Sequence, residues 1–200
     1  MGLFSMFKKE SNEKPDISEI AYDYDGYDIA FESGKTEPKL YSEINNIVTN
    51  NNFDINNISE YKNLNINSDY ETFLTFYDSW LEELKNNNYV IYLDNYTNIT
   101  EFTNKINQLL DKINSDKKID VDLITNEYKE ELKKYSFMGN DIEENFNYDI
   151  LEANIVAQEL RKIGYELINF FIGYDNNDKT IIKVEDIEKL KEIEKKIKII

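Results

Sequence analysis

Histidine and cysteine are absent from the 200 residues of this sequence, and Arg161 is its only arginine. Imidazole is the side chain whose ordinary pKa lies nearest neutral pH, so the usual general acid–base and histidine-assisted nucleophilic mechanisms are excluded. Zinc sites built from cysteine or histidine are excluded with them. A single guanidinium also leaves little capacity for bidentate recognition of phosphate. Any chemistry must therefore come from carboxylates, hydroxyls, tyrosines and lysines.

Positive charge and long apolar runs are scarce as well. The chain has 23 Lys and Arg residues against 40 Asp and Glu residues, a formal net charge of −17. This excess repels nucleic acid and anionic membranes, so we expect no binding to a nucleic-acid backbone. No apolar run approaches the roughly 20 residues that span a bilayer, and the first residues lack the apolar core of a signal peptide. We expect a cytoplasmic protein without a membrane span, and the preference for Asn, Lys, Ile and Tyr is typical of an AT-rich bacterial genome.

The residues that are present suffice for a folded domain. Apolar residues make up 40% and aromatic residues 14% of the sequence, which is enough for a hydrophobic core at this length. We interpret residues 1–15 as a flexible N-terminal segment and residues 16–200 as a single domain. The Asn-rich stretch 50–67 is polar and prone to form turns, so a division of the domain within this stretch is an alternative.

Two hairpins are predicted, one near each end of the sequence. The dipeptide Asp25-Gly26 is typical of a two-residue hairpin turn, and it separates alternating runs at 20–24 and 27–31. Near the other end, runs at 165–174 and 180–184 flank an Asp-Asn-Asn-Asp turn. Each hairpin would contribute two antiparallel strands to a sheet.

Helices and single strands are expected between the hairpins. Apolar residues at helical spacing, together with capping residues, predict the helices. These are expected after Pro38, from the capping box that begins at Ser68, from Asn98, at 126–135, at 149–163 before Gly164, and at 185–197. Short strands are expected at 89–93 and at 119–123, where apolar residues alternate with Asp120 and Asp122. This order predicts an α+β fold, with a three- to five-stranded mixed or antiparallel sheet, hairpins near both ends and amphipathic helices packed on the sheet.

The densest carboxylate cluster consists of Asp23, Asp25 and Asp28 around the first turn. In the expected register Asp23 and Asp28 face each other, and like charges there destabilise the hairpin unless a cation or a lysine neutralises them. An EF-hand calcium loop does not fit, because aligning Gly26 with the glycine of that loop puts Ala21 at the first ligand position. The cluster is interpreted either as a nonstandard Ca²⁺ or Mg²⁺ site or as a solvated hairpin face with no cofactor.

Acidic residues also gather in three runs that contain no base, at 16–32, 69–83 and 141–159. Solvated faces are the simpler interpretation of these runs. The alternative is a negative surface that steers a basic partner protein, and the tyrosines among these acids suit a protein interface. If the first hairpin leaves one face uncovered, its contact patch would consist of Tyr22, Tyr24 and Tyr27.

Three functions follow from these features. The leading hypothesis is a nonenzymatic cytoplasmic binding module with an acidic surface, such as an inhibitor or immunity-type protein that acts on a basic partner. The alternative is a Mg²⁺- or Mn²⁺-dependent phosphoesterase or other hydrolase that uses only carboxylate ligands, supplied by Asp94, Asp120 and Asp122. A third possibility is a subunit whose apolar helix face, from Phe73 to Leu84, completes an oligomer.

Overall fold

A computed structural model describes residues 27–30, 37–93, 97–136, 148–171 and 178–199. Over this part the protein is a mixed α+β fold, as the sequence predicts. The strands are β1 (Tyr27–Ala30), β2 (Ile91–Tyr92), β3 (Tyr165–Phe171) and β4 (Asp178–Lys183). The α-helices are α2 (Pro38–Val48), α3 (Tyr70–Asn86), α4 (Ile99–Lys112), α5 (Val121–Ser136), α6 (Tyr148–Lys162) and α7 (Ile187–Ile199), with short 3₁₀ helices η2 (Ile55–Asn57), η3 (Glu60–Asn63) and η4 (Val184–Asp186). Within the described ranges, no helix combines the length and the apolar character needed to cross a membrane.

The described strands form one sheet in the order β1-β3-β4-β2. Strand β1 runs parallel to β3, with Tyr27 beside Ile168, and β4 runs antiparallel to both β3 and β2. The predicted pairing of the two strands near the C-terminal end is therefore confirmed. At the other hairpin, the first predicted strand, 20–24, lies outside the described residues, and the second strand is β1.

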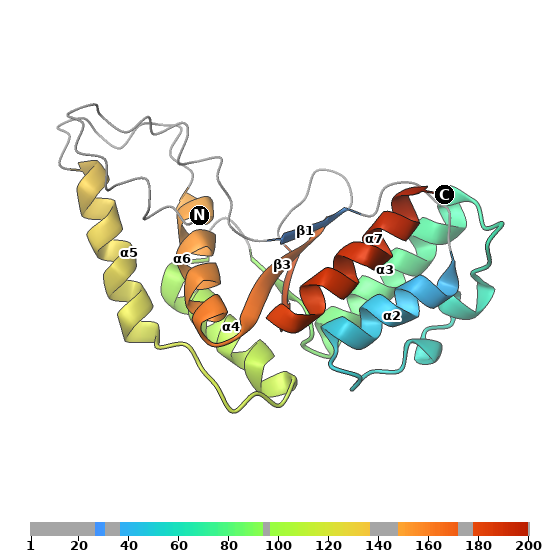
Figure 1. The fold of residues 1–200 in the computed structure, drawn as a ribbon, viewed down its shortest axis with the longest axis horizontal. Helices are drawn as coiled ribbons and strands as arrows, with labels where there is room; N and C mark the ends of the chain where they lie inside the picture. The colour runs from blue at the N-terminus through green and yellow to red at the C-terminus, as the bar shows by residue number, and fades with distance from the viewer. Residues whose placement is uncertain (1–26, 31–36, 94–96, 137–147, 172–177, 200) are drawn as a thin grey trace.

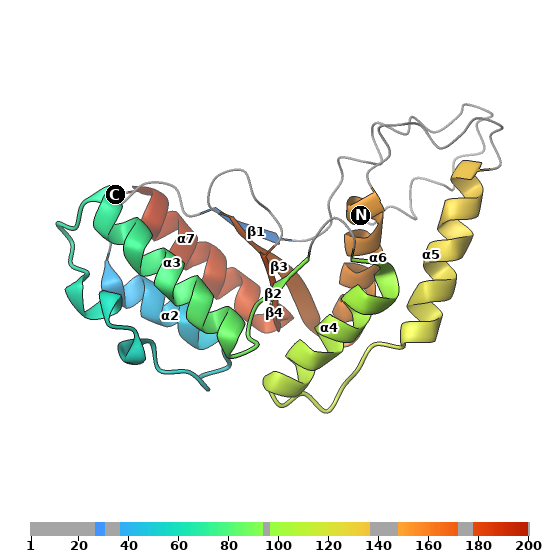
Figure 2. The same cartoon turned by 180° about the vertical axis from the view of Figure 1, so that it is seen from behind.

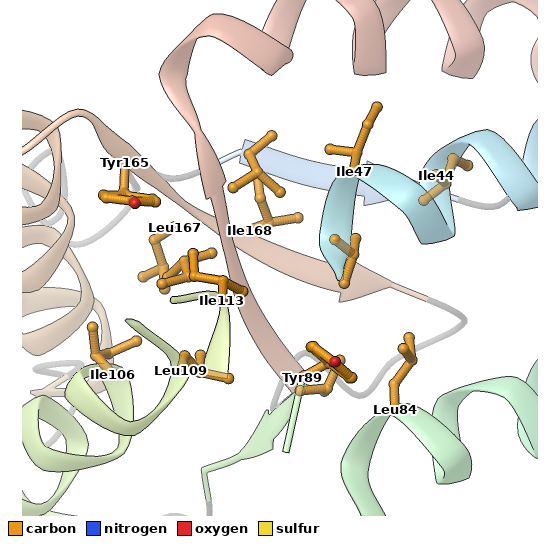
Figure 3. Packing of buried hydrophobic residues seen from close by; sticks show 14 of the residues in the cluster. Ile44, Ile47, Leu84, Tyr89, Ile106, Leu109, Ile113, Tyr165, Leu167 and Ile168 are labelled. Carbon is orange, nitrogen blue, oxygen red and sulfur yellow. The ribbon is translucent and has the colours of Figure 1, made fainter. Parts of the chain in front are cut away.

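Two groups of helices pack against this sheet and share one core. Figure 1 shows α2, α3 and α7 at one end, α4, α5 and α6 at the other, and the strands between them. Figure 3 shows buried side chains from both groups meeting residues of the sheet, among them Ile44, Leu84, Ile106, Leu109, Leu167 and Ile168. The Asn-rich stretch 50–67 joins the same core, because its Ile55, Ile58 and Leu64 are buried. A division of the domain within this stretch stays a prediction.

Aromatic rings fill the space between α2 and α3. The ring of Tyr41 on α2 lies 5.5 to 6.2 Å, between centroids, from the rings of Phe73, Phe76 and Trp80 on α3. Burial raises the pKa of the Tyr41 phenol. The apolar face of α3 is therefore covered within the chain, since Phe73, Phe76, Trp80 and Leu84 are at most 1% exposed. The hypothesis that this face completes an oligomer is wrong.

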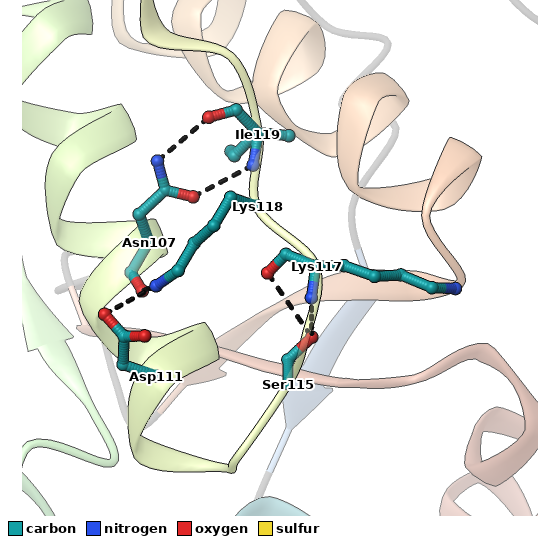
Figure 4. Close-up of polar contacts among 6 residues, drawn as sticks. All are labelled: Asn107, Asp111, Ser115, Lys117, Lys118 and Ile119. Carbon is teal, nitrogen blue, oxygen red and sulfur yellow. Dashed lines mark hydrogen bonds and ion pairs between the residues drawn. The ribbon is translucent and has the colours of Figure 1, made fainter.

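The strand predicted at 119–123 is also wrong, because α5 begins at Val121. The side chain of Asp120 accepts the backbone N–H groups of Asp122 (2.9 Å) and Leu123 (3.0 Å), as a residue that caps a helix N-terminus does. Ile119 is extended but pairs with a side chain instead of a strand (Figure 4). The amide of Asn107 on α4 accepts the Ile119 N–H and donates to the Ile119 carbonyl, both at 2.9 Å. One amide side chain thus replaces the neighbouring strand that the alternating pattern suggested.

The capping residues decide where two other helices begin. For α3 the cap is Asp69 and not Ser68, because Asp69 accepts the Thr72 N–H at 2.8 Å while the Ser68 hydroxyl accepts the Asn65 N–H. Hydrogen bonds from the Thr72 side chain and backbone hold the pKa of Asp69 below its ordinary value. The predicted cap of α4 is confirmed, since Asn98 accepts the Glu101 N–H at 3.0 Å.

Candidate functional site

The carboxylates and tyrosines predicted on the first hairpin are only partly placed. Asp23, Asp25, Tyr22 and Tyr24 lie outside the described residues. Tyr27 and Asp28 are in β1, where their backbones lie beside Ile168 and Asn169 of β3. Among the residues that the structure describes, no group of three or more acidic side chains is arranged to hold a metal ion. The predicted Ca²⁺ or Mg²⁺ site and the tyrosine contact patch stay predictions.

The three carboxylates assigned to a hydrolase site do not share a strand. Asp94 lies outside the described residues, whereas Asp120 caps α5 and Asp122 is exposed in the first turn of that helix. The expectation that Asp120 and Asp122 project together from a strand is therefore wrong. The carboxylate of Asp120 already accepts two backbone N–H groups, which accounts for this residue without a metal.

Replacing Asp120 tests this structural role. Asp120→Ala should lower the free energy of unfolding by about 1 kcal/mol, because two N–H groups of α5 lose their acceptor. Asp120→Asn should stay within about 0.5 kcal/mol of the wild type, since an amide oxygen also caps a helix. Urea denaturation of both variants with and without Mn²⁺ measures these changes. If Asp120→Asn loses as much stability as Asp120→Ala when Mn²⁺ is present, but not when it is absent, the Asp120 carboxylate would instead be a metal ligand.

The single arginine is engaged inside the fold. Its Nε lies 2.7 Å from Glu166 Oε2 and its Nη2 lies 3.0 Å from Glu166 Oε1, so Arg161 at the end of α6 forms a two-point ion pair with β3. The Glu166 side chain is only 7% exposed. The one side chain suited to bidentate phosphate recognition therefore binds a carboxylate of the protein itself.

The strongest surface feature is a row of carboxylates along α3. We call Glu71, Asp78 and Glu82 the acidic face, because spacings of seven and four residues put them on one side of the helix, opposite the buried rings. All three side chains are exposed. Figure 2 shows α3 on the outside of its group of helices, in front of α7. The acidic face therefore points away from the rest of the protein.

A carboxylate from a neighbouring element extends this surface. The pKa of Glu60 on η3 is held below its ordinary value, chiefly by the Ser59 hydroxyl, which lies 2.6 Å from Glu60 Oε2. A smaller contribution comes from the hydroxyl of Ser79, so Glu60 lies close to α3. Lys62 is the only base between Asp54 and Leu84.

On three other helices, one acid has a lysine partner on the same helix. These pairs are Glu101 and Lys105 on α4 (3.1 Å), Glu130 and Lys133 on α5 (2.5 Å), and Glu188 and Lys191 on α7 (2.9 Å). The three carboxylates of the acidic face form no ion pair with any residue in the described part of the chain. The nearest lysine in sequence, Lys85, pairs with Asp178 of β4 at 2.9 Å.

This arrangement costs the protein some stability. Asp78 and Glu82 are four residues apart, and like charges at that spacing destabilise a helix by a few tenths of a kcal/mol. A cationic ligand would relieve this repulsion. In the sequence, this face is indicated only by the run 69–83, which contains acids but no base. The absence of ion pairs to these acids can be recognised only from the three-dimensional structure.

No family model, curated protein or solved structure matches this chain, so the function has to be inferred from the chemistry of its own surface.

Proposed function

We propose that this protein is a nonenzymatic binding module whose acidic face on α3 binds a basic protein, as an inhibitor or immunity-type protein would. The observation that carries the proposal is the contrast in ion pairing. Lysines on the same helix pair with one acid each on α4, α5 and α7, whereas Glu71, Asp78 and Glu82 are three exposed acids on one side of a single helix and have no ion pair in the described part of the chain. We further propose a cytoplasmic location in a bacterial cell and binding that needs no divalent ion.

The physical basis is electrostatic steering followed by local pairing. A net charge of −17 attracts a basic protein from a distance and raises its rate of association. At contact, lysine or arginine side chains of the partner would supply the countercharges that α3 lacks. Such binding should weaken with salt, because the screening length falls from about 10 Å at 0.1 M to about 3 Å at 1 M ionic strength.

Neutralising the acidic face should weaken partner binding with little change in stability. For the triple variant Glu71→Gln/Asp78→Asn/Glu82→Gln we expect about tenfold weaker binding, equivalent to about 1.4 kcal/mol. We expect the free energy of unfolding to change by less than about 0.5 kcal/mol, because the loss of the favourable interaction of Glu71 with the first turn of α3 offsets the relief of the repulsion between Asp78 and Glu82. Pull-down from cell extract at low and high salt identifies the partner, and titration of the purified partner measures the affinity.

A matched control separates the acidic face from net charge. The triple variant Glu101→Gln/Glu130→Gln/Glu188→Gln removes the same three charges from acids that have lysine partners. It should keep nearly the wild-type affinity and lose a few tenths of a kcal/mol of stability, because it breaks exposed ion pairs. Equal loss of affinity in both triple variants would show that net charge alone governs binding, and the proposal would be wrong.

A further inference from the structure

Two exposed apolar residues come just before the acidic face in the chain, Ile66 in the turn that precedes α3 and Tyr70 at the first position of α3. Ile66 is 58% exposed and Tyr70 is 54% exposed, the two highest values for large apolar residues in the described ranges. Ile66 sits in a tight turn in which the Asn65 carbonyl accepts the Ser68 N–H at 3.0 Å. Tyr70 is the first residue of α3, and its ring lies 6.5 Å from the ring of Phe73. Both side chains are thus presented from ordered backbone.

Other apolar residues of α3 continue the flank on which Tyr70 lies. Leu74 and Leu81 are half-buried and pack against the core. At 100° per residue they fall within about 40° of Tyr70 around the helix, whereas Glu71, Asp78 and Glu82 occupy the neighbouring side. The outer surface of α3 is therefore apolar along one flank and negatively charged beside it.

We propose that Ile66 and Tyr70 form an apolar anchor point for a basic amphipathic helix of the partner, which lies along the acidic face. This inference rests on the proposed function and specifies its partner. Charge complementarity selects the occupant, because the acidic face extends from Glu71 to Glu82, a rise of about 16 Å along α3, and three turns of a lysine-rich helix match this length. One aliphatic or aromatic side chain at the end of that helix packs between Ile66 and Tyr70. Tyrosine is a frequent centre of binding energy in such contacts.

Two synthetic helical peptides test this proposal with the 200-residue protein. Both carry lysines at positions i, i+7 and i+11, and they differ only in a terminal Leu or Ser that would meet the anchor point. Wild-type protein should bind the Leu peptide about tenfold more tightly than the Ser peptide, because only the leucine buries apolar surface. In the variant Ile66→Ser/Tyr70→Ser this preference should disappear, while binding of the Ser peptide stays unchanged.

The control is the variant Leu123→Ser/Val184→Ser. It replaces side chains of comparable exposure, 45% and 42%, that lie outside α3 and its preceding turn. This variant should keep the full preference for the Leu peptide. Equal binding of the two peptides by the wild type would overturn the anchor point, and so would a preference that survives in Ile66→Ser/Tyr70→Ser.

The variant with a neutralised acidic face distinguishes the two proposals. If it loses affinity for both peptides while the wild type does not discriminate between them, the acidic face binds basic helices and only the anchor point is wrong. If it binds both peptides as tightly as the wild type, the proposed function fails, and the anchor point fails with it.

Discussion

Replacing Asn45 by leucine should lower the free energy of unfolding by about 3 kcal/mol, although the two side chains have similar volumes. Asn45 on α2 is completely buried. Its Oδ1 accepts the indole Nε1–H of Trp80 at 3.0 Å, and its Nδ2 donates to the Phe53 carbonyl at 2.8 Å. Leucine would remove the acceptor of the buried Trp80 indole N–H and the donor to the part-buried Phe53 carbonyl, at a cost of about 1 to 3 kcal/mol each. Urea denaturation followed by the fluorescence of Trp80, the only tryptophan, measures the effect.

The neighbouring residue provides the control for this substitution. Asn46 is exposed on the same helix, so Asn46→Leu should change the free energy of unfolding by less than about 0.5 kcal/mol. In a Trp80→Phe background, followed by circular dichroism, Asn45→Leu should cost about 1 kcal/mol less, because the indole donor is already absent. Equal losses for Asn45→Leu and Asn46→Leu would show that the amide does not organise this part of the core.

Replacing the single arginine should have an effect of similar size. For Arg161→Met we expect the free energy of unfolding to fall by about 2 to 3 kcal/mol. This is less than the cost of breaking a fully buried ion pair, because the Arg161 side chain is 37% exposed. The buried Glu166 carboxylate would lose both of its bonds to the guanidinium. Arg161→Lys keeps the charge but not the two-point geometry, so its loss should be intermediate. Thermal or urea denaturation of the three proteins checks this order.

An exposed ion pair provides the comparison. Lys133 and Glu130 on α5 are both about two-thirds exposed, and Lys133→Met should cost less than about 0.5 kcal/mol. Arg161→Met should also cost less in a Glu166→Gln background, because no buried charge remains there. If Arg161→Met behaves like Lys133→Met, the Arg161–Glu166 pair does not anchor α6 to the sheet.

Local signals predicted the parts of the fold that depend on neighbouring residues. Asn98 caps α4 and Gly164, with a φ of 88°, follows α6, both as expected, because capping involves only a few consecutive residues. The strand at 119–123 failed because the amide that pairs with Ile119 belongs to Asn107, on a preceding helix. The parallel pairing of β1 with β3 could not be predicted either, because no local sequence pattern specifies a partner strand that is distant in the chain.

The sequence predicted part of the candidate site, as it predicted part of the fold. The run of acids from 69 to 83 indicated a negative surface, but the grouping of Glu71, Asp78 and Glu82 on one side came from the bounds of α3 in the structure. Whether lysines from other elements neutralise them depends on the tertiary structure, and so does the exposure of Ile66 and Tyr70. Asn45 was missed entirely. The only signal was a polar residue among the apolar positions Ile44, Ile47 and Val48 of a helix stripe.

The parallel contact between β1 and β3 determines the order in which the sheet can be completed during synthesis. Tyr27 and Ile168, which lie side by side, are separated by 141 positions in the chain. At about 5 to 20 residues per second, β1 is made roughly 7 to 28 seconds before its neighbour exists. The aromatic contacts between α2 and α3 link residues 41 to 80 and can form much earlier. On the ribosome, the contacts between α2 and α3, the helix that carries the acidic face, can therefore form before β3, β4 and α7 are made, while β1 lacks its neighbouring strand until β3 has been translated.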